Sequence, residues 1–371
     1  MKSNRTRMLA LVAVVAVAAL VWFGRHRIHF NWSVFLEQLR LADWRRIALA
    51  LGCIYLGYVV RGLRWVLLMR HKKKLPPLSL VGTQVIGFTA VALIGRVADL
   101  VRPYLVAKKT GLPLGSQIAV YIVERLFDFG AMALIFSIAM IGVPAQEIMR
   151  ATAHGGPVAR LAQHHPMAAL AIERYGGLML TVFGALFLIA VRLVGDTTAT
   201  VLERGLRPVS LKLSDAVGSK VRTFHAGLDA IRSFGDFAAT AALSLGMWLL
   251  IALSYLEGCR AFVASPPLAG ASASKCILVM IASGGASIIQ LPVIGWFSQI
   301  GIVMIAITAV FGARPEAATA CAATLLVVTF LGIVPVGLLW ARFDHVSLIK
   351  VAEESEHAGE ELAHLREESA S

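Results

Sequence analysis

The sequence predicts an all-α polytopic membrane protein with about 7–9 hydrophobic helices, including broken or re-entrant segments. The chain has 371 residues, of which 58% are hydrophobic and 15% are charged, whereas an ordinary soluble domain has roughly 25% charged residues. The mean hydropathy is +0.75. Several apolar runs approach or exceed the roughly 20 residues that a helix needs to cross a bilayer, and they extend along almost the whole chain.

Nine apolar segments are candidates for these helices: 8–24, 47–69, 78–94, 114–142, 176–194, 237–257, 274–294, 297–312 and 317–341. In the first of them, Trp22 and Phe23 stand where a signal peptide would have small residues, so we expect an uncleaved span. Segments 78–94 and 274–312 are short or interrupted by Gly, Pro and polar residues, which is typical of discontinuous helices beside a cavity. Two halves that each contain a broken segment suggest a structural pseudo-symmetry.

Positive charge predicts the orientation in the membrane, because loops rich in Lys and Arg stay in the cytoplasm. The N-terminus, the run at 70–74 and the loop at 192–236 are basic, whereas 143–175 is poor in positive charge. An odd number of crossings must separate 70–74 from 143–175, so segment 78–94 should re-enter and 114–142 should cross. We therefore expect a multi-pass protein of the inner (cytoplasmic) membrane with both termini in the cytoplasm. The linker at 25–46 is predicted to form an amphipathic helix on the membrane surface.

Two parts of the chain differ in composition. Residues 1–349 are predicted to form one polytopic transmembrane domain. Residues 350–371 are predicted to form an acidic, disordered cytoplasmic tail, because the stretch from Glu353 to Ser371 has seven Glu, one Arg and no aromatic residue. The formal net charge is +13. The basic residues of the chain cluster between apolar runs, where they set topology and attract anionic lipid, so nucleic acid is not expected as a partner.

Neither a metal nor a cofactor is predicted. The four cysteines lie within or beside apolar runs without paired spacing, which indicates neither a disulfide framework nor a zinc site. The chain lacks the G-x-x-x-x-G-K-[ST] spacing of a phosphate-binding loop, so ATP-driven transport by this chain alone is not expected. Histidines at 154 and 164–165 are interpreted as loop residues rather than as metal ligands.

Six ionisable side chains lie within or next to the apolar segments between residues 95 and 128: Arg96, Asp99, Arg102, Glu124, Arg125 and Asp128. Each costs on the order of 2.5–3.5 kcal/mol at the centre of a spanning helix, so these groups must pair with one another or face water. Salt bridges that only fix helix packing are one interpretation. Apolar residues would pack more cheaply than buried ion pairs, however, so a cluster this dense favours a site that a polar group enters.

The spacing of these residues places them on shared helix faces. Arg96, Asp99 and Arg102 are separated by three residues each, and Pro103 marks an interruption or a new helix start. In the next segment, Glu124 and Asp128 share one stripe.

Three further positions extend the predicted site. Tyr121 lies one turn before Glu124, and Arg61 lies on a stripe with Tyr58 and Trp65 in segment 47–69. Arg64 is expected to snorkel toward the membrane surface, because it is close to the basic run at 70–74. Arginine suits bidentate recognition of phosphate, so the predicted site is cationic and accepts a phospholipid headgroup.

The motifs "GRVADLVRPYLVAKKTG" and "ERLFDFGAMAL" resemble the signature of the lysylphosphatidylglycerol synthase transmembrane, or flippase-like, family. The resemblance covers about residues 8–341 and implies a polytopic protein that moves lipids between leaflets. By this resemblance, the six ionisable residues form its polar site. The family also has a late Pro-Gly-Gly bend that closes on a glutamate. Here "SGGASIIQLPVIGWFSQIG" keeps Pro292, Gly295 and Gly301 but has Ser298 and Gln299 where the acid is expected.

The predicted function is therefore lipid translocation without chemistry, with a membrane phospholipid or lipid-linked molecule as partner. Loss of the late carboxylate should weaken preference for a cationic, aminoacylated headgroup. The family's two-domain synthases carry a soluble aminoacyl-transfer domain that is not expected here, so a separate lipid-modifying enzyme is a further candidate partner, as is a second copy of the chain. Two alternatives stay open: a membrane enzyme acting on a lipid-linked substrate, and a non-transporting partner in envelope lipid biosynthesis.

Overall fold

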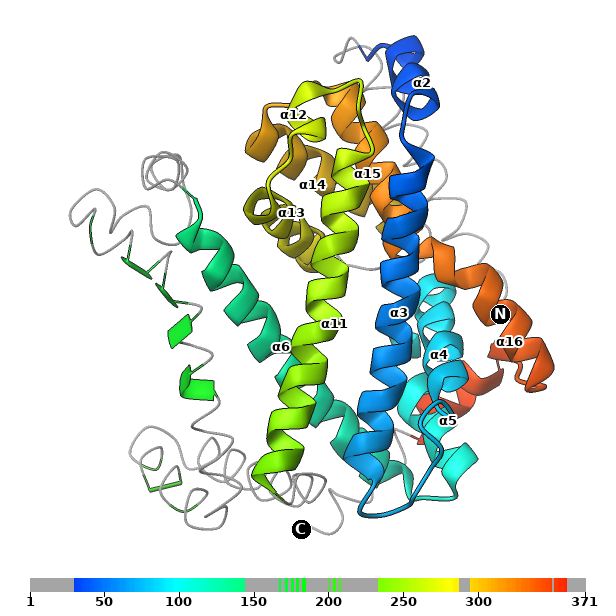
Figure 1. Cartoon of the computed structure of the whole chain (residues 1–371). Helices are drawn as coiled ribbons and strands as arrows, with labels where there is room; N and C mark the ends of the chain where they lie inside the picture. The colour runs from blue at the N-terminus through cyan, green and yellow to red at the C-terminus, as the bar shows by residue number, and fades with distance from the viewer. Residues whose placement is uncertain are drawn as a thin grey trace.

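The structure is a computed structural model that describes residues 30–143, 233–286, 294–348 and 350–358, with scattered positions between 167 and 207 (Figure 1). All regular elements in these stretches are helical, which confirms the predicted all-α fold class. The predicted segment at 8–24 and nearly all of 176–194 lie outside the described residues.

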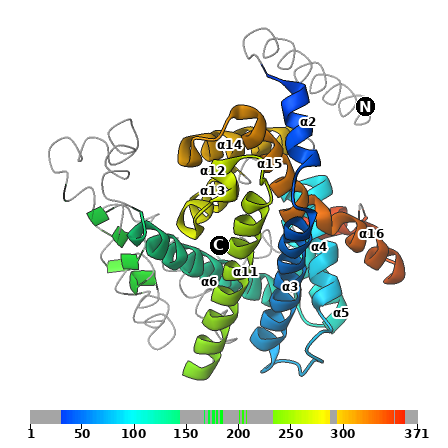
Figure 2. The ribbon, with the colours of Figure 1, turned by 45° about the horizontal axis from the view of Figure 1, so that its top comes forward.

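Two long helices, α3 (Trp44–Met69) and α11 (Phe234–Arg260), pack antiparallel along the centre of the molecule (Figures 1 and 2). At one end, the Asp43 N–H donates to the Ala261 carbonyl oxygen at 2.8 Å. At the other end, His71 Nε2 lies 3.0 Å from Asp236 Oδ2, and Arg70 also pairs with Asp236. We name this second end the basic end, because residues 70–74 form it, and the opposite end the α2 end, after α2 (Trp32–Arg40).

The first hairpin enters the bundle from the basic end and is made of α4 (Val81–Ile94), the short η1 (Arg96–Leu100) and α5 (Val101–Thr110). Gly95 makes the reversal possible, because its φ of 92° lies in the left-handed region that favours glycine. Lys73 Nζ donates to the Thr110 carbonyl oxygen at 2.6 Å, and Lys72 Nζ donates to Ser116 Oγ at 2.9 Å. The chain therefore returns to the end it started from, as the re-entry predicted for 78–94 requires.

The second hairpin enters from the α2 end and is made of α13 (Ala273–Ala286) and α14 (Ile294–Phe311), preceded by the short α12 (Pro266–Ala269). Arg260 Nε donates to the Ala271 carbonyl oxygen at 2.9 Å, which ties the start of this hairpin to the end of α11. The Asn31 N–H donates to Glu316 Oε1 at 3.2 Å, which ties the residues after α14 to the start of α2. Both ends of the second hairpin therefore lie at the α2 end.

Each hairpin is followed by a long apolar stretch. After the first comes α6 (Leu114–Ile141). After the second come α15 (Pro315–Thr329), η4 (Leu331–Ile333) and α16 (Val334–Phe343), with a break at Phe330 that the sequence analysis did not predict. By length and composition, three stretches in the described part could cross a membrane: Trp44–Met69, Phe234–Arg260 and Pro315–Phe343. These spans support a multi-pass membrane protein.

The two halves repeat one plan in opposite directions. In each, a long helix is followed by a hairpin and then by a second long stretch: α3, the first hairpin and α6 in one half, and α11, the second hairpin and α15 in the other. Figures 1 and 2 show the hairpins on opposite sides of the α3–α11 pair. Because they enter from opposite ends, this is the arrangement of an inverted repeat.

The predicted disorder of the acidic tail is wrong for residues 350–358, which are helical and pack against the first hairpin. Val351, Ala352 and Ser355 are buried. The Tyr104 hydroxyl donates to Glu354 Oε2 at 2.8 Å. Apolar residues spaced along this helix supply the burial that composition alone does not reveal. Residues 359–371 lie outside the described residues.

Candidate functional site

Arg64 of α3 is at the centre of a buried ionic cluster. Its side chain is fully buried, and its two terminal nitrogens reach two different carboxylates of α6. Nη2 lies 2.5 Å from Glu124 Oε1, and Nη1 lies 2.5 Å from Asp128 Oδ1 and 2.7 Å from Ser244 Oγ of α11. The prediction that Arg64 snorkels to the membrane surface is therefore wrong, because two carboxylates at its own depth satisfy the guanidinium inside the bundle.

Arg102 of α5 brings a second guanidinium to the same carboxylates. Its Nη1 lies 3.1 Å from Glu124 Oε2 and 3.4 Å from Gln84 Oε1 of α4. The guanidinium also lies over two aromatic rings, 4.5 Å from the Phe88 centroid and 4.9 Å from the Tyr121 centroid. Stacking on aromatic faces holds the plane of the guanidinium while leaving N–H groups at its edge free to donate.

Arg61 and Arg125 complete the cluster from its outer side. Arg125 Nη2 lies 3.0 Å from Asp128 Oδ2, as expected for residues three apart on one helix face. Arg61 Nη1 lies 3.9 Å from the same oxygen and its guanidinium lies over the Phe88 ring. Arg61 Nη1 and Arg125 Nε are buried and make no hydrogen bond to any described residue.

We name these six residues the arginine cluster: Arg61, Arg64, Arg102, Arg125, Glu124 and Asp128. Four cations against two anions give it a net charge of +2. Such a surplus inside an apolar bundle is costly unless an anion compensates it.

A cavity of 250 Å³ adjoins the cluster and is lined by residues of both hairpins. Arg61, Arg125 and Tyr121 line it beside residues of both hairpins. The first hairpin contributes Phe88, Asp99 and Arg102, and the second contributes Ser283, Gly284 and Gln299. Arg125 is 40% exposed and lies at the mouth of the cavity, whereas Glu124 and Asp128 are buried behind the arginines. The accessible face of the site is therefore mainly cationic, with Asp99 as its one acidic lining residue in the described part.

The structure thus brings together seven of the predicted site residues: Arg61, Asp99, Arg102, Tyr121, Glu124, Arg125 and Asp128. The backbone of Arg96 lies in η1, but its side chain falls outside the described residues, as does Pro292. Gly295 and Ser298 lie in the first turns of α14, where Ser298 Oγ donates to the Gly295 carbonyl oxygen at 3.0 Å. Neither lines the cavity. Gln299 lines it instead, where the family pattern has an acid nearby.

Sequence reasoning missed three contributors. Besides Arg64, α11 supplies Ser244, and Trp248 Nε1 donates to Asp128 Oδ1 at 3.3 Å. Ser244 and Trp248 are four residues apart on one helix face, so a polar stripe in segment 237–257 was the available signal.

No group of three or more His, Cys, Asp and Glu side chains able to hold a metal occurs among the residues that the structure describes. All four cysteines are buried and free, and the Sγ atoms of Cys259 and Cys321 lie 3.8 Å apart. They pack in the apolar core.

Comparisons with known proteins agree with the resemblance carried by the sequence motifs. A UPF0104 membrane protein of Methanothermobacter thermautotrophicus is 30% identical over 149 residues, which are 39% of this chain and 42% of that relative. The chain therefore matches less than half the length of that relative. No solved structure matches. A family model described as "Lysylphosphatidylglycerol synthase TM region" matches residues 9–337. The chain therefore belongs to the lysylphosphatidylglycerol synthase TM region family.

Proposed function

We propose that this protein is a lipid translocase that binds a phosphate-bearing headgroup in the cavity of the arginine cluster and moves it between leaflets. The single observation that carries the proposal is the net charge of +2 next to a cavity at the junction of two oppositely directed hairpins. A lipid phosphate would supply the missing negative charge. Its acyl chains would stay in the bilayer while the headgroup passes between the hairpins.

The free hydrogen-bond donors support an anionic guest. Arg61 Nη1 and Arg125 Nε have no hydrogen-bond partner in the described part of the chain, and both residues line the cavity. A phosphate has several acceptor oxygens and can take charge-assisted hydrogen bonds from more than one guanidinium. Binding would then satisfy donors that the fold leaves without acceptors.

The engagement of the carboxylates favours transport over catalysis. Glu124 accepts from Arg64 and Arg102, and Asp128 accepts from Arg64 and Trp248. A general base needs an oxygen within hydrogen-bond reach of the substrate, but these oxygens face arginines behind the cavity wall. We propose accordingly that the protein is not an enzyme and uses no cofactor or metal.

The cavity-lining residues of the second hairpin are uncharged in the described part, which bears on the choice of lipid. Gln299 lies in the cavity wall, and its Nε2 donates to Ser283 Oγ at 3.1 Å. A carboxylate there would attract a cationic headgroup, whereas an amide does not. We propose an anionic or zwitterionic phospholipid as cargo. If the cargo is an aminoacylated lipid instead, a separate enzyme supplies it.

The basic end is proposed to face the cytoplasm of a cell (inner) membrane, which places both termini there, because basic loops are retained on that side. The native cysteines are buried. In a Lys74→Cys variant, a membrane-impermeant maleimide should therefore label the introduced thiol in inside-out vesicles and not in intact cells. Labelling in intact cells would reverse this orientation.

Flipping is tested with purified protein in vesicles that contain a fluorescent phosphatidylglycerol, whose outer-leaflet fraction is bleached by dithionite. Arg61→Gln should keep the fold, since its one ion pair is long, and should reduce flipping at least about tenfold through loss of a charged donor. Arg45→Gln is the matched control, because Arg45 is exposed in the first turn of the same helix. Equal flipping by folded Arg61→Gln and the native protein would refute the proposal.

A further inference from the structure

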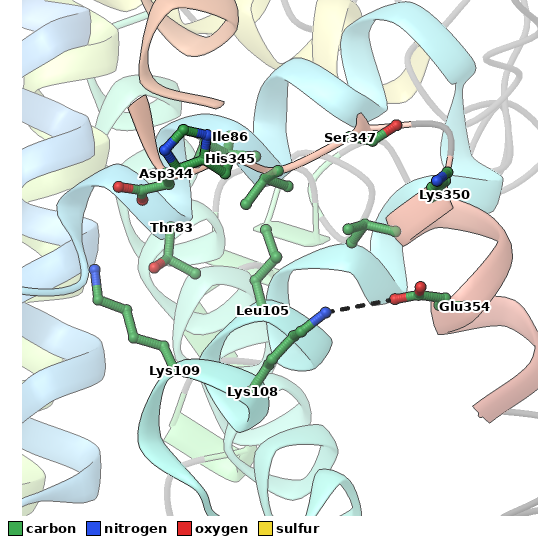
Figure 3. Close-up of a pocket in the computed structure, with 12 residues that line it drawn as sticks. Thr83, Ile86, Leu105, Lys108, Lys109, Asp344, His345, Ser347, Lys350 and Glu354 are labelled. Atoms are coloured by element: carbon green, nitrogen blue, oxygen red, sulfur yellow. Dashed lines mark ion pairs between the residues drawn. The ribbon is translucent and has the colours of Figure 1, made fainter. Parts of the chain in front are cut away.

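A second polar cavity, of 500 Å³, lies at the basic end, separate from the arginine cluster (Figure 3). Four parts of the chain enclose it: α4, α5, the residues that follow α16, and the helical stretch 350–358. Its walls combine basic, hydroxyl and apolar side chains. None of the arginine cluster residues lines it.

Three lysines line this cavity: Lys108 and Lys109 at the end of α5, and Lys350 on the tail. Lys108 Nζ is 3.7 Å from Glu354 Oε2, the ion pair drawn in Figure 3. Lys109 and Lys350 are exposed and have no ion pair with any described residue. Asp344 and Glu354 are the acidic lining residues, so the wall has a net charge of +1 before any contribution from His345.

Polar and apolar lining is divided within the cavity. Thr83 and Ser347 contribute hydroxyls to its wall. Ile86 and Leu105 contribute apolar surface (Figure 3). Lysine ammonium and hydroxyl groups together bind phosphate oxygens, while apolar surface suits the glycerol and first methylenes of a lipid.

The position of the cavity favours the same ligand chemistry. Lys73 Nζ donates to the Thr110 carbonyl oxygen, which places the basic run 70–74 beside the end of α5. Basic pockets between membrane helices on the side rich in Lys and Arg are suited to anionic lipid headgroups. We propose that this cavity is a second site that binds a phosphate group, carried by an anionic phospholipid or present as free phosphate.

Glu354 acts in this proposal as an internal competitor. It accepts from the Tyr104 hydroxyl and pairs with Lys108, so the tail supplies a carboxylate to one of the three lysines. An entering phosphate would compete with this carboxylate for Lys108. Lys108 lies on the same short helix, α5, as Arg102. A ligand in the second site would therefore contact the helix that carries Arg102 of the arginine cluster.

Isothermal titration of the purified full chain tests the site with three probes: dihexanoyl phosphatidic acid, dihexanoyl phosphatidylcholine and sodium phosphate. Phosphatidic acid should bind, and Lys109→Ala/Lys350→Ala should weaken its binding by at least about tenfold through loss of two charged donors. Glu354→Gln should strengthen binding, because it removes the competing charge and keeps the side-chain shape. Lys74→Ala is the matched control at the same end of the molecule and should bind like the native chain.

The sources of phosphate are separated by the probes. Binding of sodium phosphate along with phosphatidic acid supports a site for the phosphate group itself, whereas binding of phosphatidic acid alone supports a lipid headgroup site. Binding of phosphatidylcholine as tight as that of phosphatidic acid would overturn the proposal, and so would unchanged binding in the double lysine variant. The weakening caused by Lys109→Ala/Lys350→Ala should be equally large in the native chain and in an Arg61→Gln background, because Arg61 lines the other cavity, so the result is independent of the proposed translocation.

Discussion

The two hairpins have the same architecture but opposite chemistry. The first carries Arg102 and Asp99 to the central cavity and stacks Phe88 against two guanidiniums, whereas the second contributes Ser283, Gly284 and Gln299. Ionic groups are therefore concentrated on one side of the site. A charge buried in a bundle needs partners held in fixed positions, whereas a neutral polar wall can shift at lower cost.

The two hairpins also differ in how tightly side chains pack around their glycines. In the first hairpin, a Cβ added at Gly87 would lie 2.2 Å from Arg102 Cγ, and one added at Gly337 of α16 would lie 1.8 Å from Thr89 Oγ1. In the second hairpin, Cβ atoms added at Gly284 and Gly285 would meet no described residue within 4 Å. Around these glycines, the described part of the first hairpin is therefore packed more tightly than that of the second.

The largest expected effect comes from removing the centre of the cluster. Arg64→Leu leaves Glu124 and Asp128 buried without their shared cation, and breaking a buried pair costs about 3–5 kcal/mol. The variant should lose yield as folded protein and unfold at a clearly lower temperature in detergent. Ser283→Ala in the second hairpin should cost far less. Similar melting temperatures for the two variants would show that the ionic side of the site contributes no more stability than its neutral wall.

A smaller effect is expected from glycine substitutions that probe packing alone. Gly87→Ala should destabilise the protein by about 1–3 kcal/mol, because a methyl group enters space filled by Arg102. Gly284→Ala should lie within about 0.5 kcal/mol of the native protein, because nothing occupies its space. Chemical denaturation followed by tryptophan fluorescence measures both. An equal loss in the two variants would show that the hairpins are packed alike.

Giving the second hairpin a charge should sharpen the comparison at the level of function. Gln299→Glu places a carboxylate in the cavity wall and should slow flipping of phosphatidylglycerol by about tenfold, since a single like-charge contact costs at least about 1.4 kcal/mol. Flipping of a lysine-substituted lipid should slow less or increase. The readout is the ratio of the flipping rates of phosphatidylglycerol and of the lysine-substituted lipid in the same vesicles. A ratio equal to that of the native protein would contradict the claim that the uncharged Gln299 sets the choice of headgroup.

The smallest expected effect lies at the outside of the first hairpin. Tyr104→Phe removes one hydrogen bond to Glu354, worth about 0.5–1.5 kcal/mol, and should speed amide hydrogen exchange in 350–358 by several-fold. Tyr55→Phe removes a hydrogen bond of the same length to the Gly332 carbonyl oxygen and should leave exchange in 350–358 unchanged. Equal exchange in the two variants would mean that Tyr104 does not fasten the tail.

Much of the fold could be predicted because apolar runs and charge report directly on membrane insertion. The helices α3 and α6 closely match the predicted segments 47–69 and 114–142. The break at Phe330 and the helix at 350–358 could not be predicted, since both depend on packing against α4 and α5, which lie far away in the sequence.

Half of the site could be predicted from local spacing, and the other half required the register between helices. Arg64 and Glu124 each lie eight residues from a partner in the Lys72–Ser116 hydrogen bond, which puts both about 12 Å from the basic end. Spacing within one segment does not reveal that Arg64 and Glu124 lie at the same depth, which is why it predicts a position near the membrane surface for Arg64. The cavity depends on how the two hairpins lie relative to α3, α6 and α11, which no single segment encodes.

Headgroup cross-linking tests the central claim most directly. A phosphatidylglycerol with a diazirine on its headgroup would be photolysed in vesicles with the native protein, and adducts would be located by mass spectrometry. The account predicts adducts at the cavity wall, at Phe88 and Tyr121, that excess unlabelled phosphatidylglycerol removes, and none at Phe129 on the outer face of α6. Adducts confined to the basic and α2 ends, with none in the cavity, would contradict the claim that a headgroup enters the arginine cluster.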